Sequence, residues 1–322
     1  MVLDFLRNML RPPELDDFVD ETQELSDEAR AARRREVIKR VRKLEIVTRR
    51  IVNDQLAGSY QSVFKGRGMD FDEVRPYQPG DEPRLVDWNV SARMEGIFVK
   101  QFVEERELTV FILVDASASQ GFGTQGKTKQ EAAAELAAML AFSAIKNNDR
   151  VGLIIFTDEV ELFVPPKKGR KHVLRVISQI LEFKPARRGT AVGAALDYFA
   201  RVCKRRSVAF ILSDFQDDGY KQSMAVVSRR HDVVPVVLVD PVEEVLPIMG
   251  TVSVQDPETG EVFAFDTVSR SGRRAFEELA AELRQRRERM FRQMKIDAIY
   301  VDTDKSYTEP LMGYFKLRSK RF

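Results

Sequence analysis

The sequence is poor in the residues on which much catalytic chemistry depends. Its 322 residues include one cysteine, Cys203, and two histidines, His172 and His231. A single cysteine cannot form an intramolecular disulfide, which favours a reducing compartment. Two histidines are too few for the ligand set of a metal phosphohydrolase, the class that the adjacent His231 and Asp232 suggest. We expect both histidines to be structural.

Motifs built around a nucleophile are also missing. No Gly-x-Ser-x-Gly pentapeptide occurs, so the sequence lacks a serine hydrolase signature. A phosphotransferase of the haloacid dehalogenase type needs a second Asp two positions after its nucleophile, and after Asp115 that position holds Ser117. We expect a protein that is not an enzyme and that does not bind ATP through a loop of its own.

The chain has almost no excess charge and no long hydrophobic run. Its 52 Lys and Arg against 50 Asp and Glu give a net charge of +2, which provides no general attraction for nucleic acid or membranes. The longest apolar helix, residues 132–145, is shorter than the roughly 20 residues that cross a bilayer. Residues 1–13 contain Asp4 and are a poor signal peptide, although contact with a membrane surface stays open. We expect a cytoplasmic protein without a transmembrane segment or a nucleic-acid partner.

Composition and pattern divide the chain into four parts. We expect a flexible acidic tail over residues 1–25 and a basic amphipathic helix with an Arg/Asp/Trp module over 26–107. A main domain with a ligand site should follow over 108–240, and an extension that packs on that domain over 241–322. The basic helix should begin at Ser26 and end at Gly58. Its apolar stripe is expected at Val37, Val41, Leu44, Val47, Ile51 and Leu56.

The Arg/Asp/Trp module covers residues 66–93 and has two interpretations. Its Arg and Asp residues alternate around the only tryptophan, Trp88. We favour a partly buried ion-pair network that pins the module to the edge of the main sheet, because paired charges around an aromatic ring suit a stable junction. The alternative is a docking surface for a partner.

Strands and helices alternate from residue 108 onward. Near-continuous apolar strands separated by helices predict an α/β fold, with a doubly wound, mostly parallel sheet covered on both faces. Two strands separated only by Asp158 and Glu159 predict a tight hairpin. In the extension we expect a β-hairpin around Asp-Pro-Glu-Thr-Gly, a helix over about 270–294, and the strand 296–303.

Polar side chains follow the strands where parallel sheets place their ligands, beyond the carboxyl ends. Asp115, Ser117 and Ser119 follow the first strand of the main domain, Thr190 lies in a later loop at the same end, and Asp214 follows the strand 207–213. These residues could simply form turns. Together, however, they are five hard oxygen donors, which suit Mg²⁺ or Mn²⁺.

The same residues carry a resemblance. The Asp-Ala-Ser-Ala-Ser stretch at 115–119, the Gly-Thr loop and Ser-Asp-Phe at 213–215 resemble the metal-ion-dependent adhesion site of a von Willebrand factor A domain. The stretch 66–93 and the segments after it resemble the bacterial family called domain of unknown function 58. The resemblance implies a von Willebrand factor A fold, a metal site on these five residues, and association with an AAA+ ATPase of the MoxR type. Gln120 is a departure, because the family usually has Met there.

These observations favour an adaptor or chaperone-like subunit over an enzyme. A partner carboxylate could complete the coordination of the ion, and Arg187 and Arg188 beside Thr190 could attract it, or could be ordinary loop residues. The expected partner is the MoxR-type ATPase or its client, and the sequence assigns no oligomeric state. The alternative is a metal-assisted hydrolase that uses bound water, with a general base among Asp158, Glu159, Asp217 and Asp218.

Overall fold

The computed structural model describes residues 39–49, 51–52, 60, 69–104, 107–123, 127–255 and 262–320. The predicted tail over residues 1–25 and both expected ends of the basic helix lie outside these residues. Within the described ranges, no helix combines the length and the hydropathy needed to cross a membrane.

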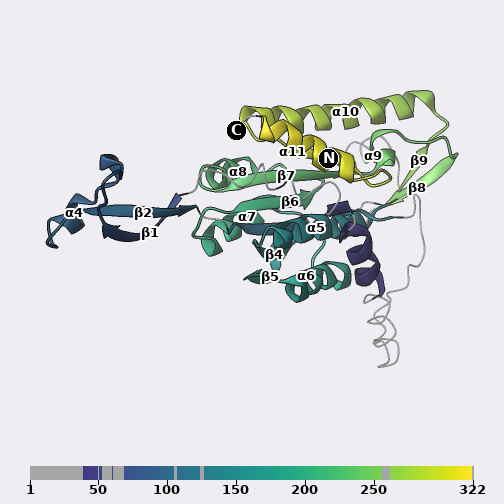
Figure 1. Ribbon diagram of the computed structural model, residues 1–322. Helices are drawn as coiled ribbons and strands as arrows, with labels where there is room; N and C mark the ends of the chain where they lie inside the picture. The colour runs from purple at the N-terminus through teal and green to yellow at the C-terminus, as the bar shows by residue number, and fades with distance from the viewer. Residues whose placement is uncertain are drawn as a thin grey trace.

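A six-stranded sheet forms the centre of the molecule (Figure 1). Its strand order is β10-β7-β6-β3-β4-β5, and every neighbouring pair is parallel except β4 with β5. The strands are β3 (Thr109–Asp115), β4 (Arg150–Phe156), β5 (Val160–Lys167), β6 (Val208–Ser213), β7 (Asp232–Val239) and β10 (Ile299–Asp302). This arrangement confirms the predicted α/β class with a mostly parallel sheet.

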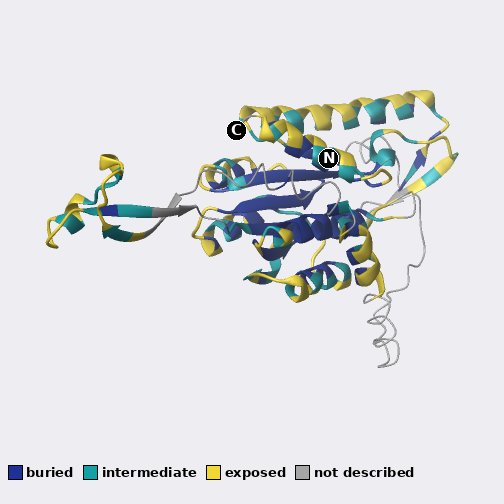
Figure 2. Ribbon diagram, in the orientation of Figure 1, coloured by how far each residue is buried: buried dark blue, intermediate teal, exposed yellow. Residues whose placement is uncertain are grey.

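Alternate residues of the central strand β3 contribute to two separate cores. Val110, Ile112 and Val114 pack on the face covered by α5, α6 and α11, whereas Phe111 and Leu113 pack on the face covered by α7, α8 and α10. The bounds of these helices are α5 (Lys129–Lys146), α6 (Arg170–Glu182), α7 (Val192–Val202), α8 (Lys221–Val227), α10 (Arg270–Gln293) and α11 (Thr308–Ser319). Burial on both faces explains why the strand is almost continuously apolar (Figure 2).

The chain after β4 brings two further loops to the carboxyl ends of the parallel strands. Strand β5 returns antiparallel beside β4, which confirms the predicted hairpin. Helix α6 then runs in the opposite direction to β5, so the loop over residues 183–191 lies at the same end of the sheet as the carboxyl end of β3. Helix α7 and strand β6 follow, and the residues after β6 reach that end as well.

The C-terminal extension adds a strand to the main sheet. The short helix α9 (Pro241–Glu244) is followed by the predicted hairpin, formed by antiparallel β8 (Thr251–Gln255) and β9 (Val262–Asp266). The long helix α10 agrees with the expected 270–294. Strand β10 then pairs in parallel with β7 at the sheet edge, and helix α11, which the sequence analysis did not predict, packs against the core.

Residues 39–49 form part of the predicted basic helix, but its buried face differs from the predicted stripe. Val41 is buried as expected, whereas Val47 is 50% exposed, so its placement in the stripe is wrong. Glu45 and Thr48 are buried instead. Glu45 occupies the interior because it forms an ion pair with Arg170 of α6, whose Nη2 lies 2.9 Å from Oε2 of Glu45.

The Arg/Asp/Trp module forms a ribbon that projects from the body (Figure 1). Antiparallel strands β1 (Met69–Pro76) and β2 (Phe98–Glu104) make a separate two-stranded sheet, with η2 (Pro83–Leu85) and α4 (Trp88–Ser91) at its tip. Arg75 and Asp81 pair at 2.7 Å, but Trp88 is 70% exposed. The expectation that paired charges around Trp88 pin this module to the sheet edge is therefore wrong.

Candidate metal centre

The end of β3 folds into a tight turn around Asp115. The Asp115 side chain is buried, and its Oδ1 accepts a hydrogen bond from the backbone N–H of Ser117 at 2.9 Å. The short 3₁₀ helix η3 (Ala118–Gly121) follows, and it places Oγ of Ser119 3.1 Å from Oγ of Ser117. The alternating polar residues of this stretch thus gather on one side of the chain, as their spacing predicts.

The end of β6 is tied directly to this turn. Ser213 donates a hydrogen bond through Oγ to Oδ2 of Asp115 at 2.6 Å, and Ser119 donates to the carboxylate of Asp214. The next residue, Phe215, has a φ of 54°, a left-handed conformation that is uncommon for a bulky residue. Its backbone N–H donates to Oγ of Ser213 at 3.0 Å, which holds this turn in place. Four of the five predicted ligands therefore form one connected group.

The loop of Thr190, the fifth predicted ligand, lies against the same turn through its backbone. The N–H of Ala118 donates to the carbonyl of Arg188 at 3.0 Å, and Thr190 is half-buried. Within the described part of the chain, no contact joins the Thr190 hydroxyl to the other four side chains. The Thr190 loop is adjacent to the group, and the role of its hydroxyl stays a prediction.

The two arginines of this loop differ in their surroundings. Arg187 is tied to the β4–β5 hairpin by ion pairs of 3.0 Å with Asp158 and 2.9 Å with Glu159. Arg188 is exposed, and we find no ion pair of its side chain among the described residues. Arg188 is thus the better placed of the two to meet an acidic partner.

Sequence reasoning missed a buried lysine at this site. Lys129, the first residue of α5, is 0% exposed, and its Nζ lies 3.0 Å from Oδ2 of Asp214 and 2.6 Å from Oε1 of Glu243 in α9. A cation at a helix N-terminus is unfavourable because it opposes the helix dipole. This unusual position of Lys129 could have identified it from the sequence. Lys129 links the metal candidate to the C-terminal extension.

The charges of this group influence one another strongly. Burial, and then the neighbouring carboxylate of Asp214, raise the pKa of Asp115 to about 7. Burial also opposes ionisation of Asp214, but the ammonium of Lys129 outweighs it and holds the pKa of Asp214 below its ordinary value. Burial disfavours the charged form of Lys129, yet Asp214 and then Glu243 raise its pKa above the ordinary value. The buried carboxylate of Asp214 and the partly buried carboxylate of Glu243 therefore share one internal cation, Lys129.

The donor set fits a hard divalent ion. Ser117, Ser119 and the two carboxylates offer only oxygen. A buried amide oxygen beside them, Oε1 of Gln120, has no hydrogen-bond partner in the part of the chain that the structure describes. Among the residues that the structure describes, no group of three or more His, Cys, Asp and Glu side chains could hold a metal. Asp115, Ser117, Ser119 and Asp214 would hold Mg²⁺ or Mn²⁺, which when bound would supply a Lewis-acidic position for an outside oxygen.

Sequence reasoning also overlooked a motif next to the site. Residues 121–128 read Gly-Phe-Gly-Thr-Gln-Gly-Lys-Thr, which matches the Gly-x₄-Gly-Lys-Thr pattern of nucleotide-binding loops. Such a loop leaves helix N–H groups open for phosphate, but here the carbonyl of Phe122 accepts from the N–H of Lys129 at 3.0 Å. A Cβ on Gly123 would lie 2.1 Å from the carbonyl oxygen of Lys127, so Gly123 lies close to the backbone that starts the helix. The described contacts thus disfavour phosphate binding at this helix start.

Helix α10 of the extension also contacts the Asp214 turn. Arg287 donates through Nη1 to the backbone carbonyl of Asp214 at 2.9 Å, and its guanidinium lies 6.0 Å from the ring centre of Tyr300. The C-terminal extension therefore contacts the candidate ligand Asp214 directly through Arg287 of α10. It reaches Asp214 indirectly from α9, because Glu243 pairs with Lys129 of α5.

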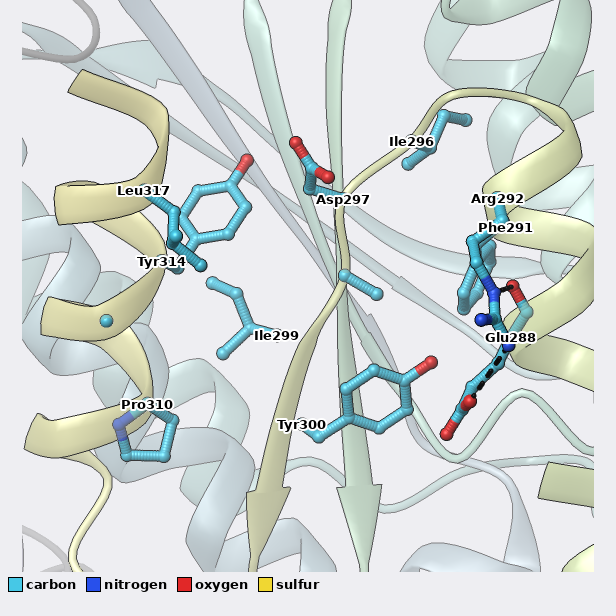
Figure 3. A pocket seen from close by; sticks show the side chains of 12 residues that line it. Glu288, Phe291, Arg292, Ile296, Asp297, Ile299, Tyr300, Pro310, Tyr314 and Leu317 are labelled. Carbon is cyan, nitrogen blue, oxygen red and sulfur yellow. Dashed lines mark hydrogen bonds and ion pairs between the residues drawn. The ribbon is translucent and has the colours of Figure 1, made fainter. Parts of the chain in front are cut away.

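A separate pocket lies beside the edge strand β10, between α10 and α11 (Figure 3). It has a volume of about 630 Å³ and is lined mainly by apolar and aromatic groups such as Phe291, Ile299, Tyr300 and Leu317. None of its lining residues belongs to the candidate metal ligands, so it is not part of that site.

Comparisons with known proteins give a family match and several relatives. The family profile described as "Protein of unknown function DUF58" matches residues 73–286. The uncharacterized protein Rv1480 of Mycobacterium tuberculosis is 33% identical over 229 residues, which cover 70% of this chain and 72% of the relative. The uncharacterized protein YeaD of Bacillus subtilis is 30% identical over 107 residues, or 33% of this chain and 25% of that protein.

Solved structures are similar to this chain only at low identity. The conserved hypothetical protein BatB from Bacteroides thetaiotaomicron has a TM-score of 0.45 at 17% identity, covering 66% of this chain and 99% of that structure. The SpRpn10 VWA domain has a TM-score of 0.35 at 12% identity, covering 64% of this chain and 94% of that structure.

Proposed function

The chain belongs to the DUF58 family, and from this premise we propose that it is a non-catalytic protein-binding subunit whose divalent-ion site captures a carboxylate of its partner. The observation that carries the proposal is the connected group of Asp115, Ser117, Ser119 and Asp214 at the carboxyl ends of β3 and β6. A bound Mg²⁺ or Mn²⁺ would leave a coordination position for an oxygen from outside.

The charge balance of the site supports an acidic ligand. The serine hydroxyls are neutral, and one of the two carboxylates, Asp214, shares its charge with Lys129 at 3.0 Å. A dication held by these groups therefore keeps positive charge, although the offset by Lys129 is partial because Lys129 also contacts Glu243. A carboxylate from a partner would complete this balance.

The surrounding carboxylates support binding more than hydrolysis. Each general-base candidate already has a partner: Asp158 and Glu159 pair with Arg187, Asp217 accepts from the N–H groups of Val192 and Gly219, and Asp218 pairs with Arg286 at 3.5 Å. A carboxylate engaged in this way is less free to accept a proton from bound water. The metal-assisted hydrolase is the weaker alternative.

We propose a MoxR-type AAA+ ATPase, or a client of it, as the partner. The support is the family resemblance, together with a binding surface suited to acidic groups around exposed Arg188. Bridging through a metal ion would make the contact local and strong, so the loss of one ligand should matter more than the loss of a rim charge.

Surface-binding kinetics with the ATPase test this proposal. Asp214→Ala should release the partner in Mg²⁺, and EDTA should have the same effect on the unsubstituted chain. Arg188→Ala and Arg187→Ala should mainly slow association and weaken its salt dependence. If the complex keeps full affinity in EDTA, the metal bridge is wrong, and the ribbon with exposed Trp88 becomes the better docking candidate.

A further inference from the structure

Gln120 occupies an unusual position beside the candidate ligands. It is the residue after Ser119, within η3, and it is the buried residue of that short helix. Only 1% of its surface is exposed. A polar amide is thus enclosed directly next to a serine that contacts both Ser117 and Asp214.

The amide of Gln120 is not satisfied by the protein. Its Oε1 is fully buried and has no hydrogen-bond partner among the described residues, and its Nε2 lies 3.5 Å from Oγ of Ser119, at the limit of a hydrogen bond. Exchanging the two ends of the amide would leave the nitrogen without a partner instead. In either orientation the buried amide therefore lacks a hydrogen bond, and this missing hydrogen bond destabilises the fold.

A methionine would fill this position without such a deficit, because it has a similar length and no polar group that needs a partner. A buried amide makes physical sense here if something outside the described protein atoms completes it. The nearest candidate is the coordination sphere of an ion bound at Ser119 and its neighbours.

We propose, on the basis of the proposed metal site, that Gln120 is a specificity-determining residue whose amide oxygen accepts a hydrogen bond from a water molecule on the bound ion. Mg²⁺ keeps several of its waters when proteins bind it, and those polarised waters need acceptors. A neutral amide oxygen provides an acceptor without adding negative charge. Ca²⁺ exchanges water for protein oxygens more readily, so Gln120 favours Mg²⁺ over Ca²⁺.

The test is calorimetric titration of Mg²⁺ and of Ca²⁺ into the full chain and into Gln120→Met. The substitution should weaken Mg²⁺ binding about ten- to a hundredfold, as loss of a group that supports a metal ligand does, and should weaken Ca²⁺ binding less. Without metal, the same substitution should raise the melting temperature by about 2 °C or more, because the unsatisfied amide is gone.

Gln130→Met is the matched control. Gln130 donates through Nε2 to the carbonyls of Ile180 and Phe183, each at 3.3 Å, so its loss should lower the melting temperature and leave Mg²⁺ affinity unchanged. If the unsubstituted chain binds Mg²⁺ and Gln120→Met binds it equally well, the role of Gln120 is refuted while the site stands. If the unsubstituted chain binds no divalent ion, the proposed site itself is refuted.

Discussion

Replacing Lys129 with methionine tests how charge is balanced at the candidate site. The substitution keeps most of the side-chain volume but removes the ammonium that lies 3.0 Å from Asp214 and 2.6 Å from Glu243. Asp214 is buried and cannot regain water, whereas 27% of the Glu243 side chain is exposed. The cost should therefore fall mainly on Asp214.

The magnitude follows from this geometry. At 3.0 Å and an effective dielectric constant of about 20, the attraction between Lys129 and Asp214 is about 5.5 kcal/mol. Desolvation of the ammonium offsets part of this attraction, but breaking a buried pair leaves an uncompensated charge, and we expect a loss of about 3–5 kcal/mol. Mg²⁺ should then bind Lys129→Met about tenfold more tightly, since no cation competes for Asp214, and should recover about 1.4 kcal/mol at saturation.

Urea denaturation in EDTA and in saturating Mg²⁺ measures both quantities. Lys127→Met is the control. Lys127 lies two residues before Lys129, but it forms a solvent-exposed ion pair with Glu135 at 2.9 Å, which contributes at most about 1 kcal/mol to stability. Adding Asp214→Asn to Lys129→Met should restore much of the stability in EDTA. A loss below about 1 kcal/mol for Lys129→Met, or an equal loss with and without Mg²⁺, would refute the reasoning.

Three further outcomes are expected. Burial, and then nearby Arg230, lower the pKa of His231 below 6.5, so folding stability should decrease as pH falls below 6.5 through the pKa of the folded protein. His231→Phe keeps a ring against Phe199 and should reduce the decline in melting temperature between about pH 7.5 and pH 5. An unchanged decline would contradict this. Trp88→Ala should change the free energy of unfolding by no more than about 0.5 kcal/mol, because Trp88 is 70% exposed; a larger loss in urea denaturation would mean that the ribbon packs on the body. ATP at about 1 mM should leave the melting temperature unchanged, because the carbonyl of Phe122 already accepts from the N–H of Lys129 at the start of α5; a clear increase would indicate nucleotide binding.

The fold and the order of the site loops could be read from local patterns. The apolar run that ends at Asp115 predicted a strand buried on both faces, and the short gap at Asp158 and Glu159 predicted a hairpin. Once the sheet was parallel, its topology placed Asp115 and Asp214 at one end, although they are 99 positions apart along the chain (214 minus 115).

Contacts without a local pattern could not be predicted. Glu243 meets Lys129 across 114 positions, and Glu45 meets Arg170 across 125, so neither pair leaves a trace in its own segment. The second pair also explains why the face of the basic helix was misplaced at Val47. Around Trp88, alternating charges have the same pattern in a buried junction as at an exposed ribbon tip, and only the folded chain distinguishes the two.

The central claim is that Asp115 and its neighbours hold one divalent ion, and calorimetric titration of Mg²⁺ into the chain and into Asp115→Asn tests it most directly. Asparagine can still accept from the N–H of Ser117 and contact Ser213, so the fold should persist, as circular dichroism can verify. We predict one Mg²⁺ per unsubstituted chain and no measurable binding to the folded variant. Equal Mg²⁺ affinity in both proteins, or no binding to the unsubstituted chain, would contradict the account.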